Sequence, residues 1–157
     1  LVARVPQTTE ELNPARASAD EIYSFIEKDM NEAIPVLPAA YGGTDIGRAT
    51  KGVALMQLAK VLLYRKRWSE VLGLTDQIQG LGYTLTPDFN TIFRISGENN
   101  SESIFEIQNQ TYTQDCGAYS QYAEVQFVRP VGWGFNVPTE DLEKAFEPGD
   151  KRKDATI

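Results

Sequence analysis

The stretch GRATKGVALMQLAKVLLYRKRWSEV, residues 47–71, limits what this chain can fold into more than any other part of it. Residues 51–65 have the composition of an α-helix, and one apolar stripe along that helix consists of Leu55, Leu58, Ala59, Leu62 and Leu63. Further apolar side chains widen the stripe well around the circumference: Val53, Ala54, Val61 and Tyr64. A helix that is apolar on so many sides needs packing partners on more than one side. We therefore expect it to be buried within a stack of helices.

A second helix is expected directly after the polar break at residues 65–67. Its apolar face holds Trp68, Val71, Leu72, Thr75 and Ile78, and it ends near the glycines of residues 80–82. Two antiparallel helices joined by a tight turn are the plan of a tetratricopeptide-type unit. Because a single pair cannot bury its own apolar face, we expect neighbouring helices.

An earlier helix is predicted after an extended, proline-containing lead-in at residues 1–17. Ser18 and Glu21 form the capping-box pattern that starts a helix, and Pro35 and Pro38 end it. Apolar residues recur at helical spacing on one face: Ile22, Phe25, Ile26, Met30, Ala33, Ile34 and Leu37. Residues 39–50, with a glycine pair and Asp45, are expected to form a loop.

The pattern changes from Tyr83 onward. Short strands are predicted at YTLTP (83–87) and SIFEIQ (103–108), with a helical turn at DFNTIFR (88–94) and a loop at GENNSES (97–103). Residues 109–136 are polar and aromatic without a long period, although AEVQFV (123–128) has a strand-like composition. Thr139 is expected to cap a short helix stopped by Pro148–Gly149, and DKRKDATI (150–157) gives no sign of a packed terminal element.

Charge and composition exclude several classes of function. With 15 Lys and Arg against 22 Asp and Glu, the net charge is −7, whereas a protein that binds nucleic-acid phosphates is expected to carry a basic surplus. The chain contains no histidine, so triads and imidazole metal sites are absent from it. The single cysteine, Cys116, has no basic neighbour that would activate its thiol. We therefore predict no catalytic residue, no metal site and no cofactor.

Four stretches resemble one known family in this order and at these spacings. They are residues 19–38 (ADEIYSFIEKDMNEAIPVLP), 47–94 (GRATKG to FNTIFR), 99–108 (NNSESIFEIQ) and 132–157 (GWGFNVPTEDLEKAFEPGDKRKDATI). Together they resemble the SusD/RagB family of starch-utilisation-type, nutrient-binding outer-membrane lipoproteins.

The resemblance implies a mainly α fold: a tetratricopeptide-like helical-repeat scaffold with a loop-rich part that carries a few short strands. Residues 1–157 would form a single partial SusD-like domain, with scaffold at 1–82 and the loop-rich portion at 83–157. Members of the family are longer than this chain, so we expect it to be an internal piece of a longer protein. The lipid anchor would then be attached to a cysteine upstream, and Cys116 does not match it because no apolar leader precedes it.

The same resemblance implies where such a protein works. It would lie exposed on the outer membrane of a Gram-negative bacterium and cover a SusC-like TonB-dependent transporter. It would hand this transporter an oligosaccharide or another nutrient, as a binding protein without catalysis. The sequence does not name the nutrient.

A sugar-binding site needs aromatic platforms for the apolar sugar faces and amide or carboxylate groups for the hydroxyls. Residues 109–136 supply both, and the predicted ligand-binding residues are Tyr112, Tyr119, Gln121 and Tyr122, with Trp133 as a weaker candidate. The alternative for each tyrosine is an ordinary structural one, with one face packed and its hydroxyl in water. Trp133 has a packing alternative as well, since it belongs to the family-like GWGF stretch. For Asn99–Glu102 we expect a turn fixed by bonds from side chains to backbone.

Two other functions remain open at this stage. One is a helical-repeat scaffold that binds a protein or peptide and has no small-molecule site. The other is a glycoside hydrolase, for which carboxylates are available at Glu106, Asp115, Glu124, Glu140 and Asp141. Nothing in the sequence places two of these across a cleft or raises the pKa of one of them.

Overall fold

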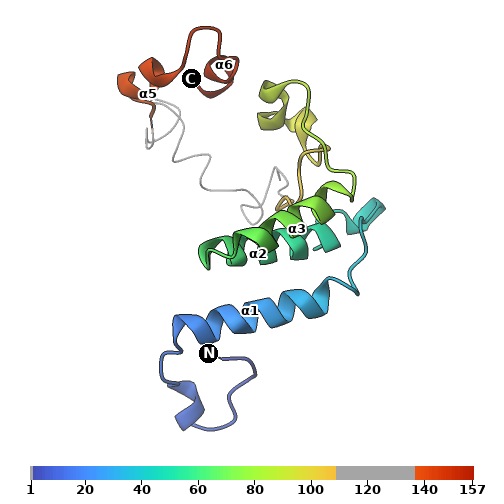
Figure 1. The fold of residues 1–157 in the computed structure, drawn as a ribbon, viewed down its shortest axis with the longest axis vertical. Coiled ribbons are helices and arrows are strands. Elements are labelled where there is room, and N and C mark those ends of the chain that lie inside the picture. The colour runs from blue at the N-terminus through green and yellow to red at the C-terminus, as the bar shows by residue number, and fades with distance from the viewer. Residues whose placement is uncertain (1, 109–136) are drawn as a thin grey trace, which may run out of the picture. The chain divides into compact units, whose positions relative to one another are not determined.

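The computed structural model describes residues 2–108 and 137–157 of the chain, and these residues are mainly helical (Figure 1). The chain divides into two compact units, Leu1–Tyr83 and Thr84–Ile157. We describe each unit by itself. The prediction of a mainly α fold is confirmed.

Helix α1 (Ala19–Ala33) begins at the predicted capping box. The Ser18 backbone N–H donates to the Glu21 carboxylate at 2.7 Å, and the Glu21 N–H donates to the Ser18 hydroxyl at 3.2 Å. The predicted apolar face is half-buried along its length. The lead-in is not wholly extended as predicted, because it contains the 3-10 turn η1 (Glu10–Leu12), whose Glu11 carboxylate accepts bonds from Arg4 and from the Gln7 backbone.

Helix α2 (Lys51–Tyr64) holds most of the buried residues of the first unit. It contacts α1 and also α3 (Trp68–Gln79), which runs beside it (Figure 1). Its buried residues are Gly52, Ala54, Leu55, Leu58, Ala59, Val61 and Leu62. The prediction of partners on more than one side is therefore confirmed. The expectation that Leu63 and Tyr64 are also buried was wrong, because these side chains are 47% and 66% exposed.

The turn between α2 and α3 ends α2 with a Schellman motif. The Arg67 N–H donates to the Leu62 carbonyl at 2.9 Å, and the Lys66 N–H donates to the Leu63 carbonyl at 3.0 Å. This motif requires a left-handed residue, and Lys66 takes that place with φ of 59°. In α3 itself the predicted face is only partly buried: Ile78 is buried, whereas Trp68 and Leu72 are 56% and 67% exposed.

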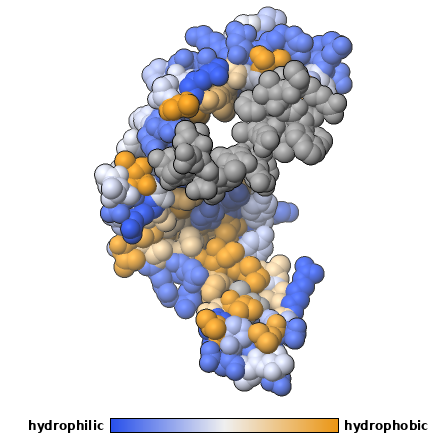
Figure 2. Space-filling model, turned by 180° about the vertical axis from the view of Figure 1, so that it is seen from behind, coloured by the Kyte–Doolittle hydropathy of each residue, from blue (hydrophilic) through white to orange (hydrophobic). Residues whose placement is uncertain are grey.

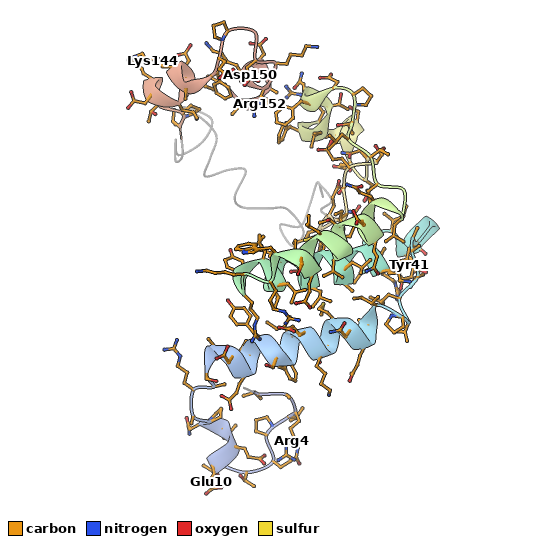
Figure 3. All side chains as sticks on the ribbon, viewed as in Figure 1. Arg4, Glu10, Tyr41, Lys144, Asp150 and Arg152 are labelled. Carbon is orange, nitrogen blue, oxygen red and sulfur yellow. The ribbon has the colours of Figure 1, made fainter. Side chains whose placement is uncertain are left out.

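An ion cluster ties α1 to this turn. The Glu27 carboxylate, 18% exposed, accepts bonds from Arg65 at 3.0 Å and from Arg67 at 2.7 Å. Arg67 also forms a two-pronged pair with Glu70, and these two acids raise its pKa. The guanidinium of Arg65 lies 5.7 Å from the centre of the Tyr23 ring. Side chains of both elements lie in the space between the ribbon of α1 and those of α2 and α3 (Figure 3).

The second unit differs from its prediction in two respects, the first of which concerns strands. Neither segment 83–87 nor segment 103–108 forms a strand, and no strand occurs among the residues described. One backbone hydrogen bond joins the first segment to the turn before the second, from the Thr84 N–H to the Ser101 carbonyl at 2.9 Å. A single bond does not make a β-ladder. The predicted helical turn is present as η3 (Phe89–Phe93), followed by η4 (Ile95–Gly97).

The C-terminal residues form two short helices, α5 (Glu140–Ala145) and α6 (Arg152–Thr156). The predicted cap on α5 is confirmed, because the Thr139 hydroxyl accepts from the Leu142 N–H. The expectation of no packed terminal element was wrong, since α6 contacts η3. Asp150 starts this last turn by accepting bonds from the side chain and the backbone of Arg152, which lies beside it (Figure 3).

Apolar side chains also reach the outside of the molecule, as the orange areas of Figure 2 show. The largest exposures in the helical unit outside the lead-in include Val36, Tyr64 and Leu72. None of the helices within the described ranges combines the length and the apolar character that crossing a bilayer requires.

We predict that Lys66→Gly stabilises the first unit by about 0.5–1 kcal/mol, because glycine adopts a positive φ without the steric cost of a Cβ atom. The matched control is Lys60→Gly, at an exposed position inside α2, which we expect to destabilise by about 1 kcal/mol. Urea unfolding followed by circular dichroism measures both. If both substitutions changed the free energy of unfolding in the same direction, the left-handed conformation of Lys66 would be contradicted.

We predict that Glu27→Gln lowers the free energy of unfolding by about 1–2 kcal/mol, because Arg65 and Arg67 lose the carboxylate that they share. Glu32→Gln on the same helix is the control. Its pair with Lys28 is about two-thirds exposed, so we expect a change within about 0.5 kcal/mol. If both variants unfolded at the same denaturant concentration, the cluster would not hold α1.

We predict an acid-sensitive turn before α6. The side chain and then the backbone N–H of Arg152 lower the pKa of Asp150 to about 2. An unfolded aspartate titrates near about 3.9, so this stabilisation is complete above about pH 4 and is lost as pH falls toward 2. In an NMR titration of the carboxyl carbon, Arg152→Gln should raise the pKa of Asp150 toward the ordinary value. If the titration midpoint of Asp150 did not change, Arg152 would not be the cause of its lowered pKa.

Candidate functional site

All five predicted ligand-binding residues lie outside the residues that the structure describes: Tyr112, Tyr119, Gln121, Tyr122 and Trp133. The same holds for Cys116 and for the strand predicted at residues 123–128. The structure does describe residues 97–108, the segment that leads into this part of the chain. Its geometry is therefore the nearest structural information on the predicted site.

A tight turn at residues 97–102 begins this lead-in segment. Gly97 is buried, and a Cβ atom placed on it would stand 2.8 Å from the carbonyl carbon of Thr91 and closer still to its oxygen. Glycine is therefore required where η4 packs on η3. The Asn100 side chain then bridges the turn, donating to the Gly97 carbonyl at 2.7 Å and accepting from the Glu102 N–H at 2.8 Å.

The Glu102 carboxylate fastens this turn to the segment before η3. One of its oxygens accepts from both the backbone N–H and the hydroxyl of Thr86, each at 2.9 Å. The Ser101 hydroxyl adds a bond to the Thr84 carbonyl at 3.1 Å. The prediction of a turn fixed by side-chain to backbone bonds at Asn99–Glu102 is thus confirmed.

Asn99 joins the turn to residues 106 and 108. Its backbone is left-handed, with φ of 53°, and its N–H donates to both oxygens of Glu106 at 3.0 Å. Its side-chain amide exchanges two bonds with the amide of Gln108, each at 3.0 Å. We call these three residues, Asn99, Glu106 and Gln108, the amide clasp. Sequence reasoning missed the clasp, because it treated residues 103–108 as a strand.

The surface of the described residues is hollowed in several places, of which three are described. One of about 620 Å³ lies between α5 and α6, and one of about 1110 Å³ lies between the lead-in and the start of α1. A third of about 280 Å³ lies among α1, α2 and α3, beside Glu27 and Arg67. None of the three is lined by a group of aromatic side chains of the kind a sugar site needs.

The described carboxylates give little support to acid–base catalysis. Those whose pKa departs clearly from its ordinary value, Glu21, Glu70 and Asp150, are all lowered by hydrogen bonds, whereas a glycosidase acid needs a raised pKa. Glu140 is exposed and paired with Lys144 at 3.1 Å. Within the described ranges no group of three acids, cysteines or histidines has the arrangement of a metal site.

No family model matches the chain, and the search among curated proteins gives no match. Solved structures do match. A SusD-like protein from Bacteroides fragilis is 33% identical with a TM-score of 0.72, over 84% of this chain and 27% of that one. Surface glycan-binding protein A from Bacteroides uniformis is 27% identical with a TM-score of 0.67, over 88% of this chain and 33% of that one.

The chain therefore spans about a quarter to a third of the length of these two proteins, while nearly all of it takes part in the match. At 84% and 88% of this chain, each match is longer than either unit alone, and it includes sequence identity as well as fold. It agrees with the resemblance found in four separate stretches of the sequence. The chain belongs to the SusD/RagB family of SusD-like proteins.

Proposed function

We propose that this chain is part of a protein that binds oligosaccharides at the surface of a Gram-negative cell and does so without catalysis. The observation that carries the proposal is the structural likeness, at 33% and 27% identity, to a SusD-like protein and to a surface glycan-binding protein.

We assign ligand contact to residues 109–136, with Tyr112, Tyr119, Gln121 and Tyr122 as the main contacts and Trp133 as a weaker one. This assignment rests on the chemistry of the sequence. Tyrosine rings offer a flat apolar face with a polar edge, and the carboxamide of Gln121 both donates and accepts hydrogen bonds. The helical unit then serves as the support for the site.

We further propose that the protein works with a SusC-like TonB-dependent transporter in the uptake of polysaccharide fragments. It would be held to the outer membrane by an N-terminal lipid anchor. These proposals follow from membership of the family. Co-purification of the transporter from solubilised outer membranes with the full-length protein tests them.

A second candidate function is protein binding by the helical scaffold. The observation in its favour is the group of large apolar side chains that lie 47–67% exposed at the α2–α3 turn: Leu63, Tyr64, Trp68 and Leu72. Exposed apolar surface of this kind marks interaction sites. Tyr64 and Trp68 are therefore useful controls for the sugar-binding proposal.

We predict that the full-length protein binds at least one member of a panel of maltohexaose, cellohexaose, xylohexaose, laminarihexaose and mannohexaose in titration calorimetry. Tyr112→Ala, Tyr119→Ala and Tyr122→Ala are tested singly. Loss of a stacking aromatic is expected to weaken binding about tenfold at one or more of these positions. The melting temperature should stay unchanged.

The matched control is Tyr64→Ala, at a tyrosine that is 66% exposed on the scaffold. Equal weakening by Tyr64→Ala would move the ligand from residues 109–136 to the helical unit. If no oligosaccharide bound and Trp68→Ala abolished capture of a protein partner, the second candidate would replace the first. Release of reducing ends from the panel would show a glycosidase instead.

A further inference from the structure

Four large apolar side chains at the α2–α3 turn are exposed together. Leu63 and Tyr64, at the end of α2, are 47% and 66% exposed. Trp68 and Leu72, one helical turn apart at the start of α3, are 56% and 67% exposed. We call these four residues the open face.

The open face lies on the side of the α2–α3 pair that is turned away from α1. The side turned toward α1 is marked by the hollow of about 280 Å³, whose lining includes Leu62 of α2 and Gln77 of α3. With 3.6 residues per turn, Tyr64 lies roughly opposite Leu62 on α2, and Trp68 lies roughly opposite Gln77 on α3. Figure 1 shows α1 along one side of the pair. The pair therefore has one face that α1 covers and a second, apolar face that no described helix of this unit covers.

A lysine borders the open face. Lys60 is exposed on α2, and Leu63 and Tyr64 follow it by three and four residues, so the three side chains are neighbours on one side of the helix. Within the described part of the chain Lys60 has no ion pair. The two arginines of the turn differ from it, because both are already bound to Glu27. A partner that brings a carboxylate to Lys60 would therefore complement this face in charge as well as in polarity.

The size of the open face favours one helix over a whole partner protein. A stable interface between separate proteins takes about 20–30 residues from each side, whereas four apolar side chains and one lysine match the contact of a single helix. A helix of the same polypeptide would be held nearby at high effective concentration and would need no large interface. This chain covers only 27% and 33% of the two solved structures that it matches, so most of a protein of that length lies outside it.

We propose that the open face is covered by an amphipathic helix from the remaining part of the same polypeptide. Its apolar side chains, spaced three or four residues apart, pack on Tyr64, Trp68 and Leu72, and an aspartate or glutamate beside them pairs with Lys60. The pair α2–α3 is then packed on both faces, with α1 on one and the added helix on the other. This inference does not depend on oligosaccharide binding, and it removes the open face from the surface available to a second protein.

Thiol labelling of the full-length protein tests whether the open face is covered. Leu72→Cys is compared with Glu32→Cys on α1, because Leu72 is 67% exposed and the Glu32 side chain is 66% exposed. Iodoacetamide labelling is followed by peptide mass spectrometry, which assigns the modification to each cysteine separately. We expect Leu72→Cys to react about tenfold or more slowly than Glu32→Cys, because a covered thiol reacts only when its cover opens.

A charge reversal tests the carboxylate. Lys60→Glu should lower the melting temperature of the full-length protein by about 2–4 °C more than Lys66→Glu, since it places two carboxylates together. Lysine and glutamate have similar helix propensities, so the change at α2 is mainly one of charge. Lys66→Glu is the matched control, because it makes the same change of net charge in the adjoining turn, outside the helix.

Each outcome decides the inference. Slow labelling at position 72 together with the larger effect of Lys60→Glu supports it. Equal labelling of the two cysteines overturns it and leaves the open face free for a separate protein. Labelling that slows only as the protein concentration rises also overturns it, since a second copy would then be the cover. Equal effects of the two charge reversals overturn the assigned carboxylate. Oligosaccharide binding is measured separately, so the proposed function stands or fails independently of these results.

Discussion

The burial of α2 between α1 and α3 is the constraint on which the helical unit depends. Its small residues, Ala54 and Ala59, lie among the leucines of the same helix and are nearly inaccessible to solvent. The hydrophobic stabilisation from such burial is roughly proportional to the apolar area removed from water, so the contacts of α2 with α1 and α3 stabilise the unit. Ion pairs such as that between Glu27 and Arg67 connect α1 to the turn between α2 and α3.

Strong periodic signals in the sequence predicted the helices well. The capping box at Ser18, the apolar run of α2 and the cap at Thr139 are local patterns, and each appears in the structure at the expected residue. The exposure of Tyr64 and Trp68 was not predictable in the same way. An apolar periodicity says which residues share a face, and it does not say which neighbours are present to cover that face.

The errors in the second unit have a physical cause. The segments 83–87 and 103–108 have strand-like composition, yet a strand exists only when its backbone groups are paired. Here side chains form the bonds instead: Glu102 accepts from the Thr86 N–H in the first segment, and Glu106 in the second segment accepts from the Asn99 N–H in the turn between them. The amide clasp brings together residues nine positions apart through their side chains, and composition alone does not reveal such pairs. The sequence correctly predicted the turn at Asn99–Glu102, which precedes the candidate site. The ligand contacts proposed within residues 109–136 remain predictions.

Closing the turn at 97–102 with side chains has a consequence for contacts with neighbouring molecules. A paired strand at the rim of a sheet exposes a row of unsatisfied backbone groups, to which a strand from another molecule can add. Between residues 84 and 108 the key backbone donors are already engaged by carboxylates and amides of the same chain. At Thr86, Asn99 and Glu102 the backbone therefore offers no free donor to a strand of a neighbouring molecule, and a substitution that removes the accepting side chain would expose one.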